Sequence, residues 1–171
     1  FDGTNDMIVT STTVDFDVFS MSVWLKTTAT AFKNIFNKSN DNNMYYAMSG
    51  GTIYLKHSIV SASAWNGTTG TTFNDGNWHH IVITAAGGSG VSSALKWYLD
   101  GSLEGTLTGT RTYTNSTDKV IGIGHWNEVT GSAFDGSLDE LSVWDNHILS
   151  AAEVTAIYNS DSPMDLSSNI G

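Results

Sequence analysis

The chain alternates short apolar runs with clusters of Gly, Asn, Asp, Ser and Thr along its 171 residues. In residues 19–27, Met21, Val23 and Leu25 alternate with more polar neighbours, and residues 95–100 repeat the pattern with Leu95 and Trp97. A period of two residues is that of a strand with one buried face. Many short runs of this kind between turn clusters predict an all-β fold of antiparallel strands in two packed sheets.

Ten segments have this character. The predicted strands are Met7–Thr10, Phe19–Thr27, Asn34–Lys38, Met44–Met48, Thr52–His57, Trp78–Ala85, Leu95–Asp100, Ser102–Leu107, Lys119–Ile123 and Leu138–Trp144. The dipeptide Asp100-Gly101 predicts a tight hairpin between two of them, because both residues tolerate positive φ.

Only one segment predicts a helix, from Ser150 to about Asn159. Ser150 followed three residues later by Glu153 forms a capping box ahead of an apolar run that includes Val154. The single proline, Pro163, comes soon after. We therefore expect one domain over residues 1–160 and a polar tail or linker over residues 161–171.

Asp139 is the one acid that interrupts an apolar pattern. It shares its strand parity with Leu141 and Val143, so we expect its carboxylate to face the same side as core residues. A buried carboxylate costs free energy unless hydrogen-bond donors or a metal ion receive it.

Composition limits the range of partners. The net charge is −10, and Arg111 is the single arginine. Phosphate backbones and anionic lipids bind clustered Lys and Arg, so neither nucleic acid nor membrane is an expected partner. The chain has no cysteine, which excludes disulfides, thiolate metal sites and thiol catalysis. No apolar run reaches transmembrane length.

Six segments, in order, carry a family resemblance. They are Phe1–Asp6, Phe19–Lys26, Asn77–Thr84, Trp97–Gly101, Ile121–Gly124 and Gly136–Trp144. In this order they resemble the laminin G-like, concanavalin A-like jelly-roll domains. The resemblance implies a two-sheet antiparallel sandwich, here with one short C-terminal helix. It also implies an extracellular, cell-surface or virion-borne binding module, often glycan-binding and often Ca²⁺-carrying.

The resemblance suggests a structural Ca²⁺ beside the N-terminal strand. The matching acid is Asp139, with Asp2, Asp6 or nearby carbonyls as partners, since Ca²⁺ prefers oxygen ligands. The alternative is that Asp139 accepts backbone N–H groups.

A second candidate Ca²⁺ site lies at one rim of the sandwich. In the pentraxins, acidic loops at similar places hold Ca²⁺ for ligand capture, and here those loops contain Asp41, Asn42 and Glu128. The alternative is that both are ordinary Asn-rich loops.

Exposed aromatics are the third candidate site. Trp65 and Trp126 lie in polar loops, and Asn127 follows Trp126. An indole gains by covering the apolar face of a sugar, while neighbouring amides bond its hydroxyls. The alternative is packing over a loop.

Catalysis is not expected. The glucanases of this fold carry a Glu-x-Asp-x-x-Glu string that this chain lacks, and its four glutamates are scattered. The sequence thus predicts a non-catalytic recognition module that binds carbohydrate or a cell-surface protein. The alternative is a structural or assembly domain of a phage fibre or a cell-surface protein.

Overall fold

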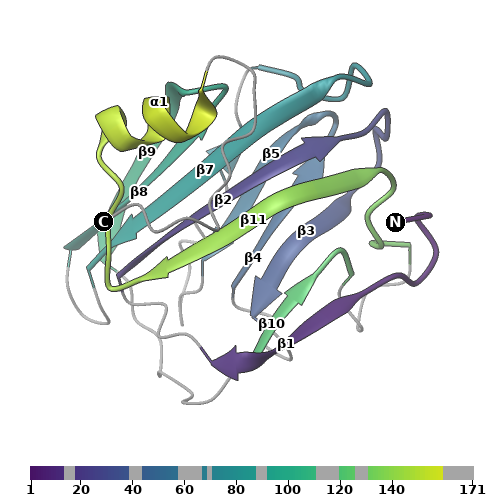
Figure 1. The fold of residues 1–171 in the computed structure, drawn as a ribbon, viewed down its shortest axis with the longest axis horizontal. Coiled ribbons are helices and arrows are strands. Elements are labelled where there is room, and N and C mark those ends of the chain that lie inside the picture. Colours follow the sequence, from purple (N-terminus) through teal and green to yellow (C-terminus); the bar gives the residue numbers. More distant parts are fainter. Residues whose placement is uncertain are drawn as a thin grey trace.

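The structure, a computed structural model, describes residues 1–13, 18–38, 44–57, 67–68, 71–87, 92–110, 120–125 and 131–159. Eleven strands and one helix occupy these residues (Figure 1). They are β1 (Ile8–Thr13), β2 (Phe19–Lys26), β3 (Lys33–Lys38), β4 (Met44–Ser49), β5 (Thr52–His57), β6 (Gly67–Thr68), β7 (Trp78–Ala86), β8 (Ser92–Leu99), β9 (Ser102–Thr110), β10 (Val120–Ile123), β11 (Ser137–Asp145) and α1 (Ala151–Tyr158).

The strands form two antiparallel sheets that stack face to face (Figure 1). One has the order β1-β10-β3-β4-β5-β6 and the other the order β11-β2-β7-β8-β9. The predicted all-β jelly-roll sandwich is confirmed, and so is each of the ten predicted strands. Only β6, two residues long, has no counterpart among them. The expected tail, residues 161–171, lies outside the described residues, and no described helix has the length and apolar character needed to cross a membrane.

The main core fills the space between the sheets. From β2 it takes Phe19, Met21, Val23 and Leu25, which confirms the predicted alternation. Opposite them lie residues of β3, β4 and β5, among them Phe36 and Tyr46, whose rings stack at 5.8 Å. Burial of these apolar faces supplies the main driving force for the sandwich.

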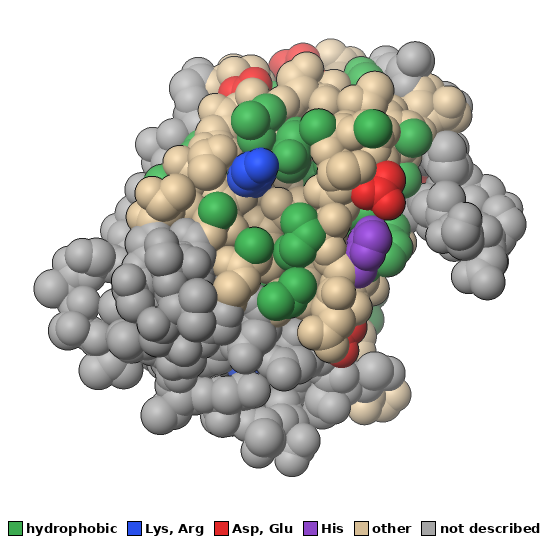
Figure 2. Space-filling model, turned by 90° about the vertical axis from the view of Figure 1, so that its left-hand side faces the viewer, with side chains coloured by type: hydrophobic (Ala, Val, Ile, Leu, Met, Phe, Trp, Pro, Cys, Tyr) green, Lys and Arg blue, Asp and Glu red, His purple; other side chains and the backbone are tan. Residues whose placement is uncertain are grey.

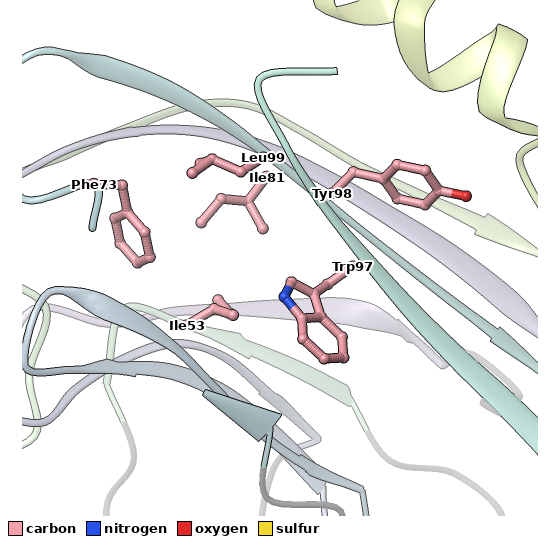
Figure 3. A pocket seen from close by; sticks show the side chains of 6 residues that line it. All are labelled: Ile53, Phe73, Ile81, Trp97, Tyr98 and Leu99. Carbon is pink, nitrogen blue, oxygen red and sulfur yellow. The ribbon is translucent and has the colours of Figure 1, made fainter. Parts of the chain in front are cut away.

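A small cavity of about 10 Å³ remains inside this core, between Ile53, Phe73, Ile81 and Trp97 (Figure 3). The indole N–H of Trp97 is buried there and has no hydrogen-bond partner among the described residues. The six-membered ring of Trp97 lies against Gly105 of β9, where a Cβ atom would collide with it. The glycine therefore makes room for the indole.

Helix α1 covers part of the outer face of the five-stranded sheet (Figure 1). The predicted capping box is present, because Glu153 N donates to Ser150 Oγ at 3.3 Å and Ser150 N donates to Glu153 Oε2 at 2.7 Å. A second small core of Val82, Tyr98, Leu149, Val154 and Ile157 lies beneath the helix.

The predicted orientation of Asp139 is wrong. A β-bulge lies between Asp139 and Ser142, and Glu140 within it adopts φ 47°. The extra residue restores Leu141 and Val143 to the core side but leaves Asp139 exposed, opposite Trp24 on the outer face. Asp139 Oδ1 accepts Glu140 N at 2.9 Å, which matches the alternative of a backbone acceptor.

The two Phe-Asp-Gly segments of the sequence pair with each other. Asp2 and Asp135 form an isolated antiparallel bridge, with Gly3 N donating to Phe134 O and Gly136 N donating to Phe1 O, both at 3.0 Å. The rings of Phe1 and Phe134 meet edge to face at 6.2 Å. The same turn chemistry thus joins the start of the chain to the approach to β11.

Candidate functional site

Two of the candidate loops leave the same end of the six-stranded sheet. Strand β3 ends at Lys38, and the register pairs Asn37 with Tyr45 and Met44 with His57. The residues that flank segments 39–43 and 58–66 are therefore neighbours. These segments contain Asp41, Asn42 and Trp65, which lie outside the described residues.

The third candidate segment starts over the outer face of β3. Gly124, with φ 84°, turns the chain back after β10, and its N–H donates to Ile35 O at 3.0 Å. The side-chain amide of Asn37 then donates to His125 O at 2.8 Å. The next residues, Trp126, Asn127 and Glu128, lie outside the described part of the chain. The segment returns at Gly131 and Ser132, where Asn34 N donates to Ser132 O at 2.7 Å.

The described residues that flank these three segments adjoin the outer face of β3, β4 and β5. We call it the outer β3–β5 face and define it by Phe32, Asn34, Asn37, Tyr45 and Tyr54. Three rings form its aromatic part. Tyr45 and Tyr54 stack at 5.9 Å, and Phe32 meets both edge to face, at 5.8 and 5.7 Å. Phe32 and Tyr54 remain half-exposed, so ring edges reach the surface.

Two asparagines form the polar part of this face. Asn37 Nδ2 donates to Asn34 Oδ1 at 3.0 Å as well as to His125 O. Both side chains are buried, and in the described part of the chain nothing bonds Asn34 Nδ2. Gly122 makes this arrangement possible, because a Cβ atom at that position would collide with the Asn37 amide. A pair of amides fixes the start of the loop that carries Trp126.

Tyr45 stays protonated on this face. Burial raises the pKa of its hydroxyl above the usual range, and the charge and hydrogen bond of neighbouring Tyr54 add to the shift. The face therefore presents the ring edges of Phe32 and Tyr54 above two buried amides, and aromatic rings are groups that contact sugars.

Asp2 and Asp6 take part in local hydrogen bonds near the N-terminus. Asp2 Oδ1 accepts Thr4 N at 2.8 Å, and Asp6 Oδ2 accepts Asp2 N at 2.9 Å, so both acids complete local turns. Within the described ranges, no three His, Asp or Glu side chains come close enough to hold a metal ion. Asp139 therefore does not form an acidic trio with Asp2 and Asp6.

A buried serine–histidine pair lies on the opposite sheet. Ser22 Oγ is 2.7 Å from His80 Nε2, the geometry of a nucleophile and its base. Both side chains are almost fully buried, and the imidazole packs against a tilted Trp24 ring at 5.1 Å and a stacked Tyr158 ring at 6.0 Å. A substrate could not reach this pair, so we assign it to packing.

His79 points to the other side of β7, as expected for adjacent strand residues. Its Nδ1 lies 2.8 Å from Asp100 Oδ2, and its Nε2 lies 3.1 Å from Asp75 Oδ1. Partial burial by itself lowers the pKa of His79, but the hydrogen bonds and charges of Asp100 and Asp75 outweigh it and raise the pKa. The cluster fixes the β8–β9 hairpin, where Asp100 adopts φ 49°.

Sequence and structure comparisons place this arrangement in a known family. A family profile described as the concanavalin A-like lectin/glucanases superfamily matches residues 1–155. The chain belongs to this superfamily. No curated protein matches the chain in sequence.

Solved structures show that this concanavalin A-like domain shares its fold with diverse proteins. A heptameric SAP-like pentraxin of Limulus polyphemus superposes with a TM-score of 0.73 at 19% identity, covering 92% of this chain and 79% of the pentraxin. Domain 4 of AbnA, an extracellular arabinanase of Geobacillus stearothermophilus solved with arabinotriose, superposes with a TM-score of 0.63 at 21% identity. The match covers 83% of this chain and 66% of the arabinanase domain. The binding domain of botulinum neurotoxin serotype D gives 0.62 at 17% identity, covering 84% of this chain but 37% of that domain.

The aromatic and amide residues of the concanavalin A-like domain were not predicted as a site. Tyr45 stands in a strand where alternation with Tyr46 was the only signal of its outward direction. Asn34 and Asn37 are three apart, a spacing that places residues on opposite faces of a regular strand. A bulge between Asn34 and Phe36 brings both to the outer face.

Proposed function

We propose that this domain is a non-catalytic extracellular recognition module that binds carbohydrate at the outer β3–β5 face. Phe32 and Tyr54 would offer ring edges there, and Trp65 and Trp126 would complete the site from the adjoining loops. Asp41, Asn42 and Asn127 would bond sugar hydroxyls, and a Ca²⁺ held by Asp41 and Glu128 would strengthen the contact.

The observation that supports this proposal is the hydrogen bond of 2.8 Å from Asn37 to His125 O. It fixes His125, the residue before Trp126, over a face that has three clustered rings. Binding domains that share the fold, including the arabinanase domain solved with arabinotriose, agree with a sugar ligand.

The test is a glycan array with and without Ca²⁺, followed by calorimetry with arabinotriose and with any glycan that the array identifies. We expect Trp126→Ala to weaken binding at least about tenfold, because an indole that covers a sugar face contributes that order of affinity. Trp78→Ala is the matched control, since Trp78 is 38% exposed and lies on the other sheet.

Equal loss in both Trp variants, or no glycan bound by the wild type in either condition, would exclude the proposal. The comparison of affinities is valid only if Trp126→Ala retains its stability in thermal unfolding.

An assembly domain is the second candidate, supported by the edge strand β1. Ile8 and Val9 are 54% and 47% exposed, and β1 is the first strand of its sheet. An apolar edge strand offers unpaired backbone groups to another chain. Light scattering after size exclusion should then show an oligomer that Ile8→Lys dissociates, whereas a monomer at high concentration would remove this alternative.

A further inference from the structure

A short segment closes one end of the sandwich. We call residues 71–77, which lead into β7, the rim strap (Figure 1). Its backbone bonds both sheets, because Phe73 N donates to Gly51 O of the β4–β5 turn at 2.9 Å and Gly76 N donates to Thr27 O just beyond β2 at 3.1 Å. The rim strap therefore bridges the two sheets.

The rim strap places one aromatic ring in the main core. Phe73 is 1% exposed, although it belongs to no strand. Its ring lines the small interior cavity together with Ile53, Ile81 and Trp97 (Figure 3). Displacement of the rim strap would therefore open this end of the core to water.

His79 links the rim strap to the neighbouring hairpin. Its Nε2 lies 3.1 Å from Asp75 Oδ1 of the rim strap, and its Nδ1 lies 2.8 Å from Asp100 Oδ2 of the β8–β9 turn. Asp75 Oδ1 also accepts Asn77 N at 2.8 Å, so the same carboxylate fixes the bend before β7. One imidazole thus joins the rim strap to the hairpin.

This arrangement requires a proton on each ring nitrogen. An ionised carboxylate only accepts hydrogen bonds, whereas a neutral imidazole has a single N–H. Both bonds of His79 therefore exist together only in the imidazolium form. Burial opposes the charge on the ring, but the hydrogen bonds and charges of Asp100 and Asp75 outweigh it and raise the pKa of His79.

Asp75 and Asp100 are the charged groups that act on this ring in the described part of the chain. On β2, the residue that pairs with His79 is the apolar Leu25. On β7, the next side chain, His80, points to the opposite face of the sheet. Burial lowers the pKa of His80 to about 4, so His80 stays neutral where His79 titrates.

Loss of one proton from His79 should break the bond to the rim strap rather than the bond to the hairpin. The bond to Asp100 is the shorter one, and Asp100 Oδ1 also accepts His80 N at 2.9 Å. The side chain of Asp75 is 56% exposed, so water can replace its bond to the ring. The neutral ring then keeps Nδ1–H on Asp100 and presents the lone pair of Nε2 to Asp75.

We infer that His79 is a pH-sensitive clasp for the rim strap, in which the imidazolium holds the strap against the sandwich and the neutral ring releases it. Release makes local opening of this end of the core, including Phe73, more frequent while the sheets stay folded. The inference is independent of the proposed function, because no residue that defines the outer β3–β5 face takes part.

The test is hydrogen exchange of the full chain at pH 5.5 and pH 9, followed residue by residue, with each rate divided by that of an unstructured peptide at the same pH. Phe73 N–H and Gly76 N–H report on the rim strap, and Gly124 N–H, which bonds Ile35 O, is the reference. Relative to this reference, we expect protection of the strap amides to fall about threefold at pH 9, since an exposed ion pair contributes a free energy of that order.

Three variants assign the effect. His79→Gln keeps a side-chain donor that does not titrate, and Asp75→Asn removes the carboxylate but keeps an oxygen that can accept Asn77 N. The pH response of the strap amides should disappear in both. His147→Gln is the matched control, because His147 is half-exposed and lies 3.4 Å from Glu153, and this variant should keep the response.

The control histidine precedes α1, and its surroundings differ from those of His79. Figure 2 shows the side of the molecule toward which β7 runs, away from the rim strap, where a histidine side chain lies among acidic and hydrophobic ones. A general effect of histidine titration on the fold would therefore appear in this control as well.

Four outcomes would overturn the inference. They are equal changes in the strap and reference amides, strap protection that rises with pH, a response that persists in His79→Gln or Asp75→Asn, and a response that disappears in His147→Gln. The melting temperature of each variant at pH 5.5 shows whether it is folded. His79→Gln and Asp75→Asn change different segments, so either folded variant decides the matter by itself.

Discussion

Asn37 donates its side-chain amide to the carbonyl of His125 at 2.8 Å, 88 positions farther along the chain. The same amide bonds Asn34 Oδ1 of the same strand, so one side chain links β3 to the start of a loop. Gly122 opposite it has no Cβ to occupy the space. These contacts hold the segment that leads to Trp126 against the outer β3–β5 face.

Asn37→Ala should lower the free energy of unfolding by about 1–3 kcal/mol, because it leaves buried polar partners unpaired. Gly122→Ala should cost a similar amount through collision with the Asn37 amide. In the double variant the collision is absent. The loss of unfolding free energy, measured by urea denaturation, should therefore be smaller than the sum of the two single losses. Additive losses would mean that Gly122 and Asn37 do not interact.

Gly105→Ala should destabilise the protein by about 1–3 kcal/mol, because the new methyl group enters the space of the Trp97 indole. Trp97→Phe removes the part of the indole that meets Gly105. We therefore expect Gly105→Ala to cost less in the Trp97→Phe background, measured by the same denaturation. An unchanged cost in that background would show that the collision lies elsewhere.

His79 should make stability depend on pH. Its folded-state pKa is raised above 6.5, so its contribution is fully present below pH 6.5 and is lost as pH rises through the folded-state pKa. The difference in unfolding free energy between wild type and His79→Gln should thus be larger at pH 5.5 than at pH 9. NMR titration should give a His79 midpoint above 6.5 that falls in Asp75→Asn, whereas a midpoint below 6.5 would contradict the assignment.

His80 should show the opposite dependence. Burial lowers the pKa of His80 to about 4, with the charge of Asp100 opposing the shift. Between pH 6.5 and 4 the imidazole therefore binds a proton in the unfolded chain but not in the folded protein. This histidine should reduce the free energy of unfolding as pH falls through that range. In the same titration its ring should remain neutral at pH 5.5, and protonation there would show that the side chain is accessible to water.

Calcium should raise the melting temperature, and a chelator should reverse the change, since a ligand of the folded state stabilises it by mass action. Two variants separate the two predicted sites. If the ion binds at the rim, Asp41→Asn with Glu128→Gln should abolish the shift and Asp139→Asn should not. The reverse result would place it beside Asp139, and no shift in the wild type would remove both sites.

The sequence by itself determined the secondary structure and the sandwich. Alternation in residues 19–27 is a local property, since a strand with one buried face needs an apolar residue at every second position. The capping box of Ser150 and Glu153 and the hairpin at Asp100 are equally local, because each depends on residues within one turn of the chain. For that reason these predictions are confirmed in the structure.

Only the tertiary structure decided which side chains share a surface. One extra residue at Glu140 reversed the direction of Asp139, and another between Asn34 and Phe36 brought two amides to one face. A bulge shifts the alternation of inward and outward side chains by one residue. It forms because of the pairing with a neighbouring strand, so the local sequence pattern does not predict it. A hollow on the outer face of the five-stranded sheet, lined in part by Lys96, has the same origin, because β7, β8 and the segment before α1 meet there only when the sheet has formed.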